Sequence, residues 1–432
     1  MLGPTSILSG RHWQERILNF TPAWFMVAMG TGAIQQALVN FPYPITGASY
    51  WMRNLGYCFW ILDILLFCFF TVMLAVRYIT HPTLINKNIT EFPSSSYFGA
   101  IPIALDTIII GIVSYYNYRP SAMWVAFGLW WVALALTLLV SIGLLIVQVS
   151  GQPQHSITDV AGLWLMTCVP MLVTAATGST IIQYLGTIST KCSITILIIS
   201  FLLWSLGTTQ IHLIIAVYFW RLVSSKLPPN QLLASGFLPL APLGQGAYGI
   251  QQLSIYLANY LRTQHYAPTQ SSPPPLPQGT LDSTAEVIHW LGILLSLFFL
   301  AHATFWLVQA SSAMISRKPK SFNIGMWGLT FPIASYANAW SYLSRDLRND
   351  GMRGWAATTT VAVVVIWLVL ALITTWLGLF KGELFNEPGL EEWIPQEKRD
   401  EETETGQSSG QSSSSEQDGS ANRRQGREAD QA

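Results

Sequence analysis

The chain has 432 residues, of which 51% are hydrophobic and only 10% are charged, with 22 basic and 22 acidic side chains. A soluble protein carries roughly 25% charged residues, so a water-soluble domain of this composition would expose large apolar patches and aggregate. The balanced charge does not indicate a nucleic-acid partner, and four cysteines are too few for a secreted disulfide scaffold. The composition therefore predicts a polytopic membrane protein.

Apolar runs long enough to cross a bilayer recur along the chain. A hydrocarbon core about 30 Å thick requires about 20 helical residues, and runs of that length indicate an all-α protein. Ten stretches meet this requirement: 22–41, 57–79, 98–117, 123–148, 162–183, 193–220, 233–261, 285–316, 322–342 and 358–380. The first has no small-residue cleavage site and nine more follow it, so we expect a retained helix instead of a signal peptide. The sequence therefore predicts an N-terminal segment (1–21), a transport domain of ten transmembrane helices (22–380) and a C-terminal tail (381–432).

An even number of spans places both termini on the same side of the membrane. With the termini inside, the short inner segments carry nine basic residues and the outer loops carry seven, which favours cytoplasmic termini. More than half of the acidic residues lie after Lys381 in a polar, serine-rich tail, which we expect to be disordered. The Pro-rich stretch 269–283 predicts a stiff, extended outer loop.

Proline divides the ten spans into two sets. The odd-numbered spans contain proline and the even-numbered spans have none internally. The prolines are Pro22, Pro102, Pro170, Pro239, Pro242 and Pro332. Proline removes a backbone hydrogen bond and kinks a helix, leaving carbonyl groups that lipid cannot satisfy. The pattern predicts an inner ring of five kinked odd helices around a central path, sheathed by five straight even helices. The alternative is that proline is simply frequent in membrane helices.

The predicted path contains no fixed cation, because no Lys or Arg lies in the middle of an odd span. Small, hydroxyl and aromatic side chains would line it, together with backbone dipoles at the helix breaks. We expect the anion path to include the breaks at Pro22, Pro102, Pro170, Pro239 and Pro332 and the hydroxyl of Thr31. Such a path binds weakly and suits a small anion.

Few ionisable residues lie within the spans, and each is a functional candidate because burial of charge is costly. Asp106 lies on an inner helix, where it is either a proton carrier coupled to anion movement or a hydrogen-bonded packing residue. Asp63 lies on an outer helix, and this position favours a packing role. His212 and His302 have no partners at metal-ligand spacing, so we expect core residues, with no metal and no cofactor. An intramembrane enzyme using Asp63 and Asp106 stays a formal alternative.

Four segments carry a resemblance to a known family. They are NFTPAWFMVAMGTG (19–32), FGAIP (98–102), FLPLAPLGQGAYGI (237–250) and MWGLTFP (326–332). They resemble the tellurite-resistance/dicarboxylate transporter family, which includes fungal malic acid permeases, fungal sulfite efflux pumps, a bacterial tellurite-resistance channel homologue and plant slow anion channels. The resemblance spans about residues 15–380. RLVSSKLPP (221–229) and PLGQGAYGIQQL (242–253) are most similar to the sulfite efflux pumps.

The resemblance implies ten helices as five hairpins in a quasi-fivefold arrangement around a central pore, commonly in a homotrimer. In channel members a phenylalanine directly before the ninth-span proline blocks the pore, and Phe331 before Pro332 matches it. Asp106 departs from the small apolar or hydroxyl residue of the sulfite pumps and fits proton coupling or a partly protonated organic acid better.

Together these observations predict a plasma-membrane anion transporter that moves sulfite or hydrogen sulfite outward, with no catalytic residues. The alternative substrate is malate or another C4-dicarboxylate, taken up by a permease that Asp106 couples to protons. The lack of a fixed cation favours the smaller anion. No ATP-binding motif is visible, so movement follows an existing gradient or a coupled ion.

Overall fold

The computed structural model describes residues 16–43, 49–263, 278–317 and 322–381. The described chain is helical throughout, and Phe20–Lys381 forms one compact unit. The N-terminal segment up to Glu15 and the tail after Lys381 lie outside the described residues. Six of the described helices are long and apolar enough to cross a membrane: 51–80, 94–116, 120–150, 190–225, 279–317 and 350–378. The protein is therefore an all-helical membrane protein.

Five helices are buried along most of their length, and each begins after a short 3₁₀ segment. They are α2 (Phe25–Val39), α5 (Ala100–Tyr116), α8 (Val169–Leu185), α10 (Leu240–Thr263) and α12 (Thr330–Asp346). The 3₁₀ segments are Pro22–Trp24, Ser94–Gly99, Gly162–Thr167, Asn230–Phe237 and Ile324–Leu329. Helix α2 contacts α5, α5 contacts α8, α8 contacts α10, α10 contacts α12, and α12 contacts α2. The buried helices therefore contact one another in a closed order.

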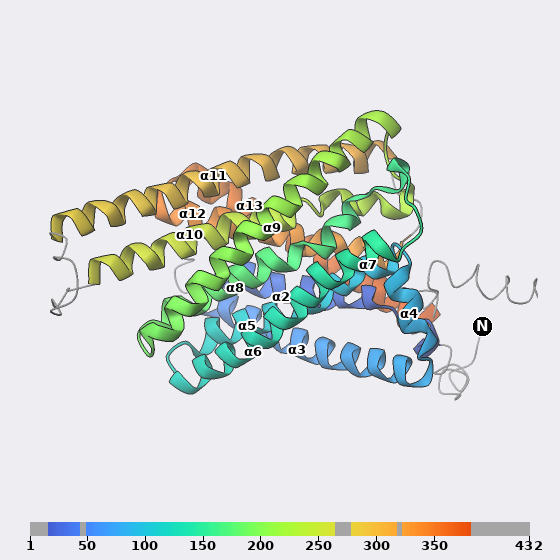
Figure 1. Cartoon of the computed structure of the whole chain (residues 1–432), viewed down its shortest axis with the longest axis horizontal. Coiled ribbons are helices and arrows are strands. Elements are labelled where there is room, and N and C mark those ends of the chain that lie inside the picture. Colours follow the sequence, from blue (N-terminus) through green and yellow to red (C-terminus); the bar gives the residue numbers. More distant parts are fainter. Residues whose placement is uncertain (1–15, 44–48, 264–277, 318–321, 382–432) are drawn as a thin grey trace, which may run out of the picture. The chain divides into compact units, whose positions relative to one another are not determined.

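The helix that follows each buried helix packs against it and exposes large apolar side chains. These partners are α3 (Ser49–Thr80), α6 (Pro120–Leu138), α9 (Thr190–Ser225), α11 (Gln278–Arg317) and α13 (Asp350–Thr375). Figure 1 shows one such pair, α10 and α11, side by side. Helix α6 continues through a π-helical segment (Leu139–Leu144) into α7 (Leu145–Ser150), and a short α4 (Thr83–Thr90) follows α3. These outer faces have the composition expected of lipid contact.

The prolines lie at the starts of the buried helices, not in their middles. Pro102 and Pro332 are the third residues of α5 and α12, Pro170 is the second of α8, Pro239 directly precedes α10, and Pro22 opens its 3₁₀ segment. Proline is tolerated in the first turn because the missing N–H has no acceptor within the helix. The breaks expected from proline are therefore junctions between 3₁₀ and α-helix, not kinks within the spans.

The 3₁₀ segments also contact one another in a closed order, at the end of the bundle where all five buried helices begin. Two glycines make this close approach feasible. A Cβ atom on Gly99 would lie 1.9 Å from the carbonyl oxygen of Met166, and one on Gly162 would lie 1.9 Å from that of Ser235. Only glycine fits such a backbone approach. The positive ends of five helix dipoles consequently gather at one end of the bundle.

The Pro-rich stretch differs in part from the extended loop that we expected. Residues 278–283 form the first turns of α11, because the last proline of the run is Pro277 and the residues after it support a helix. The rest of the stretch lies outside the described residues.

Candidate functional site

A small pocket lies where the five 3₁₀ segments and the buried helices that follow them converge. It is lined by Met26, Tyr97, Leu163, Gln231, Leu232, Ser235, Leu238, Gly325 and Gly328. Each of the five units contributes at least one of these residues. We call this the axial pocket. It lies at the end of the bundle where all five buried helices begin.

Phe331 continues a row of residues that lines the axial pocket. Three residues complete one 3₁₀ turn, so Gly325 and Gly328 share a face, and Phe331 follows three residues later as the second residue of α12. The Phe331 side chain is 1% exposed and stacks on no aromatic ring of the described residues. The matching row on the preceding segment runs through Ser235 and Leu238 to a small residue, Ala241. Phe331 is therefore a large side chain one turn deeper than the pocket.

The lining of the axial pocket is uncharged. Its polar groups are the Tyr97 hydroxyl, the Gln231 amide and the Ser235 hydroxyl, which donates to the carbonyl oxygen of Leu232 at 2.6 Å. The N-terminal ends of the buried helices, with their partial positive charge, lie next to the pocket. The predicted path prolines, Pro22, Pro102, Pro170, Pro239 and Pro332, are all buried at these helix starts, and none lines the pocket itself.

Asp106 lies between helices and not in the axial pocket. The Thr174 hydroxyl on α8 donates to its Oδ2 at 2.7 Å, and the Thr137 hydroxyl on α6 lies 2.7 Å from that of Thr174. The second carboxyl oxygen, Oδ1, makes no hydrogen bond of ordinary geometry within the described residues. Asp106 thus joins α5 to α8 next to an outer helix, which agrees with a packing role.

Asp63 makes a similar contact one hairpin earlier. The Thr107 hydroxyl on α5 donates to its Oδ2 at 2.8 Å. The carboxyl group fits because the neighbouring residue on α2 is Gly32, where a Cβ atom would lie 2.3 Å from Oδ2. Asp63 and Asp106 therefore bind different threonines in different helix contacts.

Polar contacts also join the other buried helices. The pairs are Gln245 and Ser335 (α10 and α12, 2.9 Å), Thr180 and Tyr248 (α8 and α10, 2.9 Å), and Asn40 and Asn338 (the residue after α2, and α12, 2.9 Å). Much of the buried polarity therefore holds the helices to one another.

Thr31 and the two intramembrane histidines also contact other side chains or the backbone. The Thr31 hydroxyl donates to the carbonyl oxygen of Val27 at 2.7 Å and accepts from Nε1 of Trp367 on α13 at 3.1 Å. His302 Nε2 accepts from Nε1 of Trp306, and the His212 ring lies 5.5 Å from the His302 ring. Within the described residues, no group of three His, Cys, Asp or Glu residues is placed to hold a metal ion.

The sequence did not assign a role to the residues that line the pocket. Gly328 and Met26 lie within the segments that carried the family resemblance, and Gly325 lies just outside one. Tyr97 and Leu163 gave no signal, because their place in the lining depends on contacts between segments far apart in the chain.

Comparisons with known proteins match this helical unit. A profile described as voltage-dependent anion channel (SLAC1) matches residues 19–375. The sulfite efflux pump of Arthroderma otae is 27% identical over 372 residues, covering 85% of this chain and 93% of that protein. The sulfite efflux pump of Saccharomyces cerevisiae is 24% identical, covering 86% and 92%. The malic acid transport protein of Schizosaccharomyces pombe is 20% identical over 161 residues, covering 37% and 36%.

Proposed function

The chain belongs to the voltage-dependent anion channel family, a family of anion channels and transporters and not of enzymes, and we propose that it carries sulfite or hydrogen sulfite out of the cell. The sulfite efflux pumps of Arthroderma otae and Saccharomyces cerevisiae support this substrate, since each aligns over most of both chains. The family leaves no role for an intramembrane enzyme built on Asp63 and Asp106.

The observation that carries the proposal is the uncharged axial pocket at the start of five helices. Helix N-termini attract anions through their dipoles without the strong binding that a lysine or arginine provides. A small anion passes such a site quickly, whereas a dicarboxylate has two charges to neutralise. Tyr97 and Gln231 supply hydrogen-bond donors of the kind from which an oxyanion accepts.

The route that we propose runs along the axis of the five buried helices. Ten membrane spans form five hairpins in a quasi-fivefold arrangement, and the closed order of contacts among the buried helices supports this. The helix breaks at Pro102, Pro170, Pro239 and Pro332 present backbone dipoles to the anion, and Pro22 begins the first unit. The Thr31 hydroxyl already has two partners, so we assign it to packing.

Phe331 is the gate in this proposal. Its side chain is buried one turn deeper than the axial pocket, three residues after the pocket glycine Gly328, and the small residue Ala241 occupies the corresponding position on the neighbouring segment. A large rigid ring at that level closes a narrow path, and its rotation or removal opens it.

Export out of the cell requires the plasma membrane, and we place the protein there. We place both termini in the cytoplasm because basic residues are more frequent in the inner segments. A homotrimer follows from the family resemblance alone.

The second candidate substrate is malate or another C4-dicarboxylate. A malic acid transport protein matches part of the chain, and a buried carboxyl group at Asp106 offers a site for a coupled proton. We rank this candidate lower because no described residue of the axial pocket is basic.

The deciding experiment compares fungal cells that lack their own sulfite pump, with and without this protein. Sulfite efflux and labelled malate uptake are followed side by side at two external pH values, with surface expression measured in parallel. We expect sulfite efflux without malate movement. Malate movement alone would reverse the substrate assignment, and movement of neither anion at normal surface expression would exclude both.

A further inference from the structure

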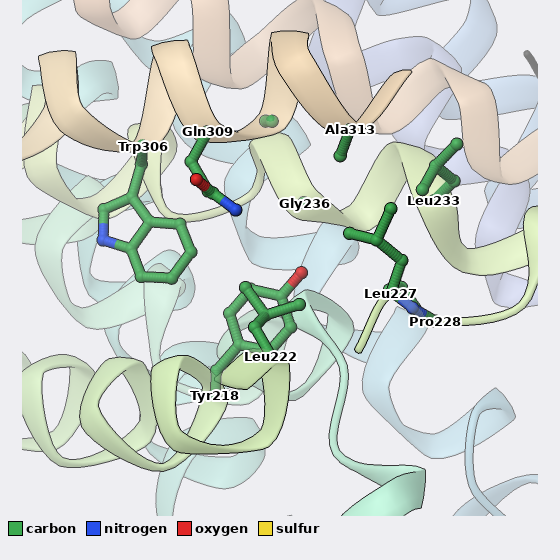
Figure 2. A pocket seen from close by; sticks show the side chains of 10 residues that line it. Tyr218, Leu222, Leu227, Pro228, Leu233, Gly236, Trp306, Gln309 and Ala313 are labelled. Carbon is green, nitrogen blue, oxygen red and sulfur yellow. The ribbon is translucent and has the colours of Figure 1, made fainter. Parts of the chain in front are cut away.

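A second pocket lies on the outer side of the 3₁₀ segment Asn230–Phe237. Its walls come from α9, the connection after it, this segment and α11: Tyr218, Leu222, Leu227, Pro228, Leu233, Gly236, Trp306, Gln309, Ala310 and Ala313. Figure 2 shows the Gln309 amide and the Tyr218 hydroxyl pointing into the space between α9 and α11. The remaining lining is apolar. We call this the lateral pocket.

The lateral pocket opens onto a surface that lipid covers. Large apolar side chains flank it on both helices. Phe219 and Val223 on α9 and Phe305 and Val308 on α11 are each between 48% and 62% exposed. Leu222, one of the lining residues, is partly exposed between them. The hollow is small and open at its mouth, so a hydrocarbon chain of the bilayer fits by lying along it and placing one methyl or methylene group inside.

Two exposed cations lie next to the pocket at the end of the bundle where α9 and α11 both finish. Lys226 directly precedes the lining residue Leu227, and Arg317 lies one helical turn beyond the lining residue Ala313. Neither forms an ion pair with a described acidic residue. Basic residues at the end of a membrane helix are typical of anionic-lipid binding, and the sequence adds Lys318 and Lys320.

One 3₁₀ segment separates the lateral pocket from the axial pocket. Leu233 and Gly236 line the lateral pocket, whereas Leu232 and Ser235 line the axial pocket. Any occupant that presses on or supports this segment therefore acts on the lining of the axial pocket.

We propose that one acyl chain of an anionic phospholipid lies along the lateral pocket, that its headgroup phosphate binds Lys226 and Arg317, and that the bound lipid holds the Asn230–Phe237 segment in place. The binding site is independent of the substrate assignment, whereas its effect on sulfite flux rests on the proposed function. The chemistry requires both a chain for the pocket and a negative headgroup for the cations.

The test uses the purified full-length protein in phosphatidylcholine vesicles containing phosphatidylserine with a photoreactive group on one acyl chain. Labelled peptides are located by mass spectrometry. We expect labelling to concentrate in 218–236 and 306–313. Lys226→Gln should lower that labelling about fivefold, since one basic residue near the surface contributes about that factor. Lys191→Gln, which removes a cation from the other end of α9, is the matched control and should leave the labelling unchanged.

Two results would overturn the site. One is labelling spread evenly over the lipid-facing helices, and the other is an equal loss in the Lys226 and Lys191 variants. Ala313→Phe provides a second test, because it fills the pocket from partly exposed α11 without removing a charge. Labelling that persists in this variant also contradicts the proposal. Sulfite flux is measured with and without phosphatidylserine, so a protein that binds the lipid but moves no sulfite refutes the proposed function and leaves the site standing.

Discussion

The hydroxyl of Thr174 on α8 donates a 2.7 Å hydrogen bond to Oδ2 of Asp106 on α5. Thr174 has only one hydroxyl proton, which it donates to Asp106. The Thr137 hydroxyl must therefore be the donor in its contact with Thr174, so both hydrogen bonds point toward the carboxyl group. The chain of contacts joins α5, α6 and α8. This geometry is that of a helix-packing contact.

The Asp106→Asn variant separates packing from proton coupling. Asparagine keeps a carbonyl oxygen that accepts from Thr174, so we expect normal expression and an unchanged pH profile of anion flux. Asp106→Ala leaves the threonine hydroxyl without its acceptor and should lower the free energy of unfolding by about 1–3 kcal/mol. Flux measured across a range of external pH decides the question, and a profile that becomes flat in Asp106→Asn would make this carboxyl group the proton carrier.

A loop outside the membrane spans should respond to acid. The carboxylate of Asp159 accepts from the backbone N–H of Ser156 at 2.8 Å, and this bond holds the pKa of Asp159 below its usual value. A lowered pKa means that the contact stabilises the loop at neutral pH and is lost as the pH falls through the folded-state pKa, below about pH 4. The neighbouring carbonyl oxygen of Thr158 accepts from the Arg221 guanidinium, so the loop is also tied to α9.

Limited proteolysis with an acid-active protease measures this response. Cleavage near 151–161 should stay constant from pH 7 to pH 5 and rise below about pH 4. In Asp159→Asn we expect faster cleavage that no longer depends on pH, because the amide cannot titrate. Equal pH dependence in the variant and the parent would assign the response to another group.

The close approach of the 3₁₀ segments predicts that replacing glycine with alanine destabilises the protein at some positions and not at others. Gly99→Ala and Gly162→Ala each place a Cβ atom against a backbone carbonyl oxygen at 1.9 Å, so the segments must separate. We expect each to lower thermal stability in detergent by at least about 1–3 kcal/mol, the usual cost of overpacking. Gly128→Ala on α6, which meets nothing within 4 Å, is the control and should melt at or slightly above the parent temperature. Melting at the same temperature in all three variants would contradict the close packing.

Much of the helical organisation was predictable from the sequence, because apolar runs and proline act locally. A helix overlaps each of the ten expected ranges, and the five ranges that contain proline hold the buried helices. The family was also predictable, since the four quoted segments lie within the matched region.

The remainder depends on contacts that no local pattern encodes. The first-turn position of Pro102 and Pro332 follows from preceding 3₁₀ segments, which hydropathy does not distinguish from α-helix. The partner of Asp106 is Thr174, 68 residues later, so its role was open until the helices were placed. The lining of the axial pocket depends in the same way on five separate segments meeting.

Phe331→Ala is the direct test of the gate. Removal of a buried ring one turn below the axial pocket should leave an opening along the proposed route and raise anion flux above that of the parent at equal surface expression. Phe299→Ala is the matched control, because that ring is also 1% exposed but lies on α11 against Trp204. Both variants lose stability of the same order, about 3–5 kcal/mol for truncation of a buried phenylalanine. A gain of flux in Phe331→Ala alone therefore identifies a gate, whereas unchanged flux, or an equal gain in both variants, assigns the ring to packing.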